Sequence, residues 1–164
     1  MNKIKAAVVS DSHDNVGNLE KVTAIANDKK CAYLFHLGDV VSPFTAQRLI
    51  AFKGIVKAVF GYCDGELIGL QRVFNTMGGE IDKPPVTLEL EKRKIILMHE
   101  PFLIDELVKS QDADFIFYGH MHKVDLRKVG KTHVLNPGDA GGWVRKPTFF
   151  IVDLLSGEHE KINL

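Results

Sequence analysis

The sequence has 164 residues, 45% hydrophobic and 26% charged, and its 21 basic and 21 acidic side chains give a formal net charge of zero. This balance is typical of a globular protein, so we expect one domain over residues 1–164. The lack of net positive charge disfavours nucleic acid as a ligand but does not exclude a small phosphate ester. The two cysteines show no CxxC spacing, which disfavours a disulfide framework or a thiolate zinc site.

The N-terminus runs directly into strand-like sequence and lacks the features of a signal peptide. No stretch approaches the roughly 20 apolar residues that a membrane span needs. We therefore expect a soluble, cytoplasmic protein that has no membrane partner. Self-association into a homo-oligomer is left open by the sequence.

The first sixty residues alternate strand-like and helix-like segments. Short apolar runs predict buried strands at residues 3–10, 31–37 and 55–60. Asn15 and Ser42-Pro43 are suited to helix starts, so we expect one helix from about Val16 and a second from Ser42 to about Phe52. This alternation predicts parallel strands joined by right-handed crossovers.

The second half is richer in strands. Helical spacing predicts short helices at residues 67–74 and 102–108. Residues 86–90 and 94–98 flank a polar turn and predict a β-hairpin. Further short strands are expected at residues 115–118, 124–129, 132–135, 148–153 and 158–162. Two mixed β-sheets packed face to face, with helices outside, satisfy both halves, so we predict a mixed α/β (α+β) fold.

Asp and His residues follow several of the predicted strands. The candidate metal ligands are Asp11, His13, Asp39, His99, His120 and His122. In open α/β sheets ligands bind outside the carboxyl ends of the strands, so we expect these side chains to converge. Carboxylate and imidazole together suit Mn²⁺, Fe²⁺, Zn²⁺, Ni²⁺ or Co²⁺. We expect structural roles for four other residues, which are His36 within a strand, His133 and His159 on late strands, and Cys31.

Six ligands are enough for two ions if one carboxylate bridges them, and Asp39 is the predicted bridge. Two ions roughly 3.5–4 Å apart would hold a water as hydroxide and clamp a phosphoryl group for in-line attack. The pattern therefore predicts hydrolysis of a small phosphate ester at a dinuclear centre.

An ordered set of short segments resembles the calcineurin-like metallophosphoesterases. In chain order they are Asp-x-His, Gly-Asp, Gly61–Asp64, His99 and Gly-His-x-His. The likeness is greatest to the small single-domain bacterial and archaeal phosphodiesterases. It implies a four-layer αββα sandwich that hydrolyses phosphodiesters or phosphomonoesters, often with manganese or nickel. The ligand sets that it implies are Asp11, His13, Asp39 and His122 for one metal, and Asp39, His99 and His120 for the second.

The segment that starts at Gly61 departs from the family pattern. Tyr62 stands where the family has a metal-binding asparagine, and a phenol is a poor ligand unless it is deprotonated. Tyr62 is therefore either a phenolate ligand or a sign of a weaker second metal site. Cys63 stands where many strong monoesterases have a proton-donating histidine, which favours diesters with good leaving groups. Asp64 is expected to orient a histidine or a water, so the predicted catalytic residues are Asp39, His99, Cys63 and Asp64.

Two further functions compete with a metal-dependent phosphodiesterase. The first is a catalytically silent protein-binding scaffold, like the phosphoesterase-like subunit of the retromer coat, and it is motivated by Tyr62 and Cys63. The second and weaker one is a nuclease, which the charge balance disfavours. Arg145 either contacts a substrate phosphate or lies in a loop anchored by Trp143, and the turn that ends at Asp139 is expected to shape the wall of the site.

Overall fold

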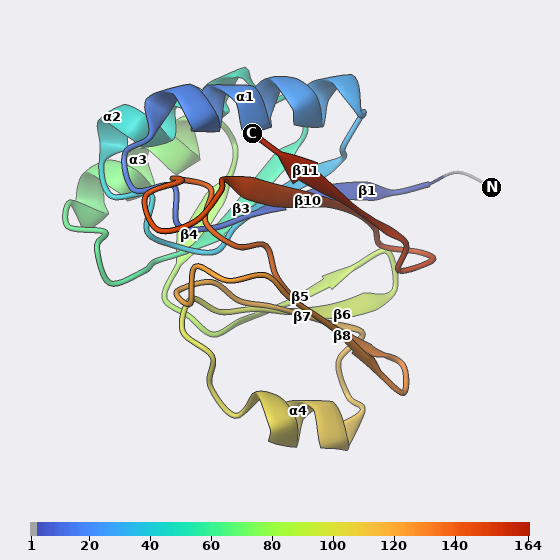
Figure 1. The fold of residues 1–164 in the computed structure, drawn as a ribbon. Helices are drawn as coiled ribbons and strands as arrows, with labels where there is room; N and C mark the ends of the chain where they lie inside the picture. Colours follow the sequence, from blue (N-terminus) through green and yellow to red (C-terminus); the bar gives the residue numbers. More distant parts are fainter. Residues whose placement is uncertain (1–2) are drawn as a thin grey trace.

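Two β-sheets pack face to face, and helices cover the outer surface of each (Figure 1). The computed structural model describes residues 3–164. Its elements are β1 (Lys5–Val9), α1 (Val16–Asp28), β2 (Tyr33–His36), α2 (Pro43–Ala46), the 3-10 helix η1 (Gln47–Ala51), β3 (Ile55–Val59), α3 (Leu67–Thr76), β4 (Glu80–Asp82), β5 (Val86–Leu90), β6 (Arg93–Leu97), α4 (Ile104–Ser110), β7 (Phe115–Phe117), β8 (Asp125–Val129), β9 (Thr132–Asn136), β10 (Thr148–Asp153) and β11 (His159–Asn163).

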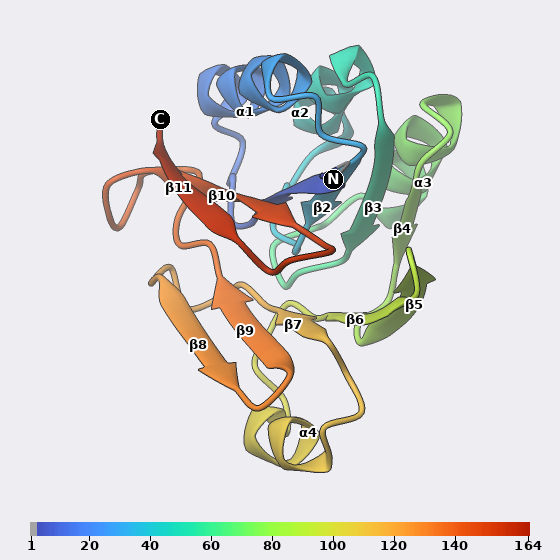
Figure 2. The ribbon, with the colours of Figure 1, turned by 90° about the vertical axis from the view of Figure 1, so that its right-hand side faces the viewer.

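Both sheets are mixed. The first has the order β11-β10-β1-β2-β3-β4, in which β1 to β4 are parallel and β10 pairs antiparallel with β1. The second has the order β5-β6-β7-β9-β8, in which the three central strands are parallel and the two edge strands antiparallel. Parallel neighbours bring their carboxyl ends to one edge, so the loops after β1, β2, β6 and β7 can meet there. Figure 2 shows the first sheet lying above the second.

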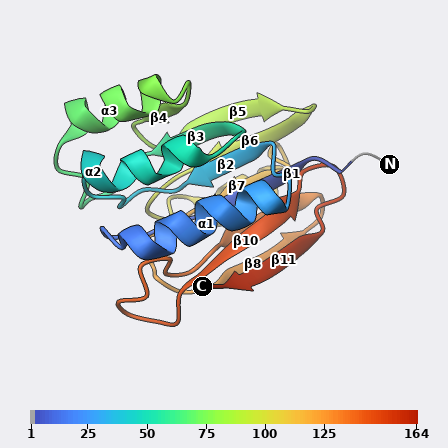
Figure 3. The same cartoon turned by 90° about the horizontal axis from the view of Figure 1, so that it is seen from above.

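Three apolar layers hold the sandwich together. Successive side chains of a strand point to opposite faces, so a central strand with both faces covered must be apolar throughout. In β1, Ala7 and Val9 pack under the helices, whereas Ala6 and Val8 pack against the second sheet. A third cluster lies between the second sheet and α4. Seen from above, α1, α2 and α3 lie side by side over the first sheet (Figure 3). This arrangement confirms the predicted four-layer sandwich.

The predicted helix starts are confirmed by their caps. Asn15 Oδ1 accepts a 3.1 Å hydrogen bond from the Asn18 amide, and Ser42 caps α2 by accepting from the Thr45 amide at 3.3 Å. The prediction of one helix from Ser42 to about Phe52 is wrong in detail, because α2 tightens into η1 after Ala46. Strand β4 was not predicted, since three residues are too few to show alternation. Among residues 3–164, no helix combines the length and hydropathy that crossing a bilayer requires.

Candidate metal centre

The predicted ligands follow four neighbouring strands, and the loops that carry them are bonded to one another. Asp11 and His13 follow β1, Asp39 follows β2, His99 follows β6, and His120 and His122 follow β7. The His13 amide donates to the Asp39 carbonyl at 2.9 Å, and the Gly119 amide donates to the His99 carbonyl at 2.8 Å. Main-chain bonds of this kind fix the loops before any ligand binds.

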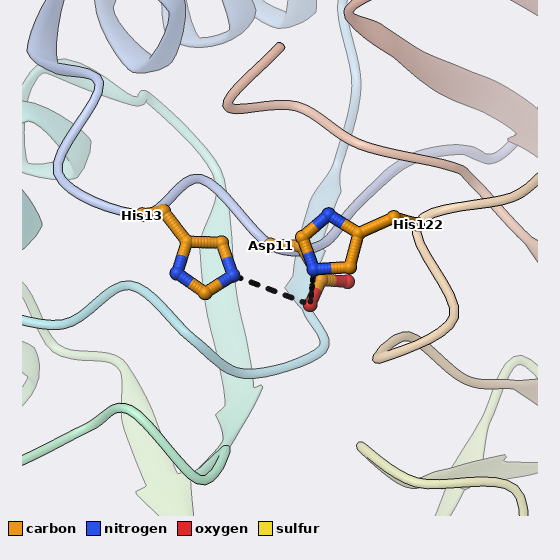
Figure 4. Close-up of side chains that lie close together, drawn as sticks. All are labelled: Asp11, His13 and His122. Atoms are coloured by element: carbon orange, nitrogen blue, oxygen red, sulfur yellow. Dashed lines mark ion pairs between the residues drawn. The ribbon is translucent and has the colours of Figure 1, made fainter. Parts of the chain in front are cut away.

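Asp11 lies at the centre of the first group of ligands. It is fully buried, and its Oδ2 accepts hydrogen bonds from Ser10 Oγ at 2.5 Å and from the His120 amide at 2.9 Å. The other oxygen, Oδ1, lies 3.5 Å from His122 Nε2 and 3.8 Å from His13 Nε2 (Figure 4). The rings of His13 and His122 stack with 5.1 Å between centroids. One carboxylate oxygen and two imidazole nitrogens therefore face a common point.

Asp39 lies between this group and His99. Its Oδ1 accepts the Cys63 amide at 2.7 Å, and its Oδ2 lies 3.4 Å from both His13 Nε2 and His99 Nε2. Burial opposes ionisation, but the contacts with His99 and Cys63 outweigh it and lower the pKa of Asp39 to about 2. A charged carboxylate between two sets of imidazoles has the position expected of a bridging ligand.

Several ligand atoms at this centre are left without partners. Asp11 Oδ1, His13 Nε2 and His99 Nε2 are buried and make no hydrogen bond within the described part of the chain. His99 Nδ1 is bonded to the Leu37 carbonyl at 2.8 Å and must be the donor there, so the Nε2 lone pair points to the centre. Buried polar groups without partners are costly, and a cation would satisfy all three. The donor set therefore fits divalent metal.

Three overlapping groups of residues could hold an ion. They are Asp11–His13–His122, Asp11–Asp39–His99 and His13–Asp39–Cys63, and in each the ligand atoms lie within 4.8 Å of one another. Asp11, His13 and Asp39 each belong to two groups. Of the predicted histidines, His120 belongs to none of these groups in residues 3–164, although its ring lies 5.2 Å from that of His99.

Tyr62 stands at the rim of the centre. Its ring lies edge-on to His99 and His120, with centroid distances of 5.7 and 5.3 Å. The side chain is 69% exposed and its hydroxyl donates to Glu100, which raises the pKa of the phenol. These contacts disfavour a phenolate ligand and leave Tyr62 as part of the wall.

The backbone of the ligand loops adopts an unusual conformation. Positive φ values occur at Asp11 (55°), His13 (41°), Asp39 (58°), His120 (65°) and His122 (50°). Side chains larger than glycine rarely occupy this left-handed region, and such residues cluster at functional sites. The main chain at Gly61 also approaches Asp39 closely, since a Cβ on Gly61 would overlap Asp39 Oδ1.

Asp64 holds two of the loops together. It is buried and accepts amide hydrogen bonds from Asp39 at 3.0 Å, Val41 at 2.7 Å and Gly61 at 2.7 Å. Burial raises the pKa of Asp64, and these three bonds oppose the rise. The predicted catalytic role becomes a positioning role in this geometry, because both oxygens are taken up by main-chain donors.

Cys63 is exposed at the mouth of the centre, beside Asp39. Burial and the Asp39 carboxylate raise the pKa of the Cys63 thiol, so it is neutral at physiological pH.

Two predictions of structural roles are confirmed. Cys31 is buried at 7% exposure, and His36 lies inside the fold, with its Nε2 3.0 Å from Ser12 Oγ. Burial lowers the pKa of His36 to about 4.

The loop after β9 adds a residue that the sequence analysis did not place beside a ligand. Asp139 is fully buried, and its Oδ2 lies 3.3 Å from His122 Nδ1. The same oxygen accepts the amides of Val144 and Arg145 at 2.8 and 3.1 Å. These contacts and His122 lower the pKa of Asp139 against the effect of burial. His122 Nδ1 and Asp139 Oδ2 are within ion-pair distance but do not have hydrogen-bond geometry. A carboxylate next to a candidate ligand histidine raises the basicity of the ring.

We expect Asp139→Asn to weaken metal binding by about 10- to 100-fold, because His122 loses the negative charge that lies 3.3 Å from its Nδ1. Calorimetric titration of chelator-treated protein with Mn²⁺ measures the change. Asp153→Asn is the matched control. Asp153 is also buried, but it lies at the end of β10, where its carboxylate accepts the amides of Ile4 and Leu155. Equal affinities in wild type and Asp139→Asn would contradict this role of the Asp139 charge.

The other residues of that loop also border the centre. Trp143 Nε1 donates to the His13 carbonyl at 3.1 Å, although the side chain is mostly exposed. Arg145 helps to line a hollow of about 280 Å³, whose walls also include His122, Lys123 and Lys146. Of the two roles considered for this loop, anchoring by Trp143 is visible as a contact, and the phosphate contact by Arg145 stays a prediction.

Comparison with known proteins agrees with this geometry. Residues 4–157 match the model of the calcineurin-like phosphoesterase superfamily domain. The chain is 28% identical to a phosphodiesterase of Methanocaldococcus jannaschii over 165 residues, which cover 98% of this chain and 99% of that protein. A solved archaeal phosphodiesterase superposes with a TM-score of 0.92 at 28% identity, over 98% of this chain and 100% of the other.

More distant structures share the fold. A phosphoesterase of E. coli superposes with a TM-score of 0.67 at 21% identity, over 97% of this chain and 98% of the other. Vacuolar protein sorting 29 of Cryptosporidium parvum gives 0.72 at 20% identity, over 99% and 97% of the two chains. With a family model that covers residues 4–157 and a donor set that fits metal, the chain belongs to the calcineurin-like phosphoesterase superfamily.

Proposed function

We propose that this protein is a single-domain, metal-dependent phosphodiesterase that acts on a small phosphate ester. The observation that carries the proposal is the convergence of the unpartnered atoms Asp11 Oδ1, His13 Nε2 and His99 Nε2 around the Asp39 carboxylate. The curated relative and the solved structure that share 28% identity over almost the whole chain are both named as phosphodiesterases, which supports the same reaction here. A cytoplasmic location is part of the proposal.

The residues that would hold two ions are the ligand sets of the family, and the geometry brings all of them except His120 into candidate metal-binding groups. Asp11, His13, Asp39 and His122 would hold the first, and Asp39, His99 and His120 the second. Mn²⁺ or Ni²⁺ is proposed, and Zn²⁺, Fe²⁺ or Co²⁺ suits the same donors. When bound, a pair of divalent ions supplies Lewis acidity at the phosphoryl oxygens and a water activated for attack on phosphorus.

The chain's own groups set the course of the reaction around the ions. Asp39, ionised and fixed by the Cys63 amide, spans the two ligand sets. His99 is held in one tautomer by the Leu37 carbonyl. The neutral Cys63 thiol is exposed beside Asp39, and it is too weak an acid to assist a poor leaving group strongly. Diesters with acidic alcohols as leaving groups should therefore react faster than simple monoesters.

The proposal is tested with purified protein that has been freed of metal and reconstituted. We expect Mn²⁺ or Ni²⁺ to restore hydrolysis of bis-p-nitrophenyl phosphate, with slower turnover of p-nitrophenyl phosphate and two ions per chain by elemental analysis. Failure to hydrolyse either ester with Mn²⁺, Ni²⁺, Co²⁺ and Zn²⁺ would overturn it and favour the alternative of a silent binding scaffold. One ion per chain would overturn the bridging role of Asp39.

A further inference from the structure

A cavity of about 530 Å³ opens directly beside the metal centre. It shares His99, Gly61 and Tyr62 with the rim of the centre, so the two spaces are continuous. Its volume lies within the range of roughly 300–1,000 Å³ that is usual for small-molecule sites. The mechanism proposed above uses only the His99 end of this space, so the rest of the cavity has no role in it.

The walls of the cavity are mostly apolar and come from separate parts of the chain. Phe60 follows β3, Pro84 and Pro85 connect β4 to β5, and Met98 and Phe102 flank the loop before α4. Met98 is buried, and its sulfur accepts the Phe102 amide at 3.5 Å. The Phe102 side chain is 63% exposed, so an aromatic ring is presented to solvent at the mouth. Exposed aromatic rings around a preformed apolar space are typical of a binding site for a ring.

Tyr62 forms the boundary between the cavity and the ligand histidines. Its hydroxyl is bonded to Glu100, which also lines the cavity, and this contact holds the ring edge-on to His99 and His120. A group that fills the cavity would therefore contact Tyr62, while a phosphoryl group attached to it lies at the His99 end of the same space. Lys83 is the cation among the lining residues, so the cavity itself is not built to hold a phosphate.

Resting on the proposed function, we propose that this cavity binds one ester group of the substrate and selects phosphodiesters in which that group carries an aromatic ring. Phe102 is the specificity residue of the cavity, because it is an exposed ring on its wall and, unlike Tyr62, has no hydroxyl bonded to Glu100. The enzyme then discriminates between diesters by the group that stays on phosphorus as well as by the leaving alcohol. Small dialkyl esters such as dimethyl phosphate would leave the apolar walls in contact with water.

Two diesters with the same leaving group test the proposal. Phenyl p-nitrophenyl phosphate and methyl p-nitrophenyl phosphate both release p-nitrophenolate, and they differ in the group that remains. We expect Phe102→Ala to raise KM for the phenyl ester about fivefold to tenfold, with little change in kcat and little change for the methyl ester. Phe102→Tyr should retain the preference. Comparison of each variant with wild type cancels the intrinsic difference in reactivity between the two esters.

Phe44→Ala is the matched control, since Phe44 is 62% exposed and packs on Arg48 instead of the cavity. It should leave both esters unaffected. Hydrolysis of both esters with an unchanged phenyl-to-methyl ratio in Phe102→Ala would overturn the inference while the proposed function stands. Absence of any hydrolysis would instead overturn the proposed function.

Calorimetry tests the inference even if the protein hydrolyses neither ester. Manganese-loaded protein should bind diphenyl phosphate at least about tenfold more tightly than dimethyl phosphate, and Phe102→Ala should remove most of the difference. Equal affinities for the two esters would overturn the inference whether or not the protein is active.

Discussion

Asp39→Asn is expected to lower kcat/KM for bis-p-nitrophenyl phosphate by about a thousandfold. An asparagine that keeps its oxygen on the Cys63 amide places its uncharged NH2 group between His13 and His99. The charge that would bind both ions is lost, and a metal ion supplies several kcal/mol of transition-state stabilisation. Since about 1.4 kcal/mol corresponds to a factor of ten, a loss of this order follows. Steady-state kinetics and elemental analysis measure the two consequences together.

The matched control for this variant is Asp114→Asn, which removes a partly buried carboxylate from the far end of the second sheet, where it bonds Lys94 and Arg93. Circular dichroism should show that both variants keep the native fold. An Asp39→Asn enzyme with more than a tenth of wild-type activity would show that the carboxylate does not bridge the centre.

The second large effect is expected on stability. Asp64→Ala should lower the free energy of unfolding by about 3–5 kcal/mol, because the amides of Asp39, Val41 and Gly61 lose one shared acceptor. For a chain of this size each kcal/mol lowers Tm by roughly 2–4 °C, so we expect a fall of about 10–15 °C. Urea unfolding of the metal-free protein measures the loss without a contribution from bound ions.

Asp112→Ala provides the comparison for Asp64→Ala. Asp112 is exposed and pairs with Lys94, and an exposed ion pair contributes little to stability because solvent screens it. If Asp64→Ala cost no more than Asp112→Ala, the three amides would have to find other acceptors, and the positioning role of Asp64 would be wrong. A loss of metal affinity in Asp64→Ala would show that the same bonds also set the position of Asp39.

The sequence was informative wherever a local pattern determines structure. The caps Asn15 and Ser42 mark helix starts because their side chains bond amides only a few residues away. The convergence of most candidate ligands could be predicted from their place after apolar strands, since parallel strands end at a common edge. These features depend on spacing within a short segment and on one general rule of sheet topology.

Contacts between distant loops were outside the reach of such patterns. Asp139 meets His122 because β9 pairs parallel with β7, which brings the loops after both strands together. Asp64 accepts amides from two loops whose relative position depends on the whole first sheet. Tyr62 was considered as a ligand from its alignment with an asparagine, whereas the direction of its hydroxyl depends on Glu100. The change from α2 to η1 also occurs where η1 contacts α1 and α2 contacts α3, elements that are distant in sequence.

The left-handed backbone at five of the ligand residues has a consequence for protein engineering. Each such residue costs stability that glycine at the same position would recover, because glycine adopts positive φ freely. A laboratory selection for heat resistance alone should therefore drift toward glycine at solvent-accessible ligand positions such as His13 and His122. Tolerance of high temperature would then rise as the capacity to hold ions disappeared, so thermal screens of this enzyme must include an assay for bound metal.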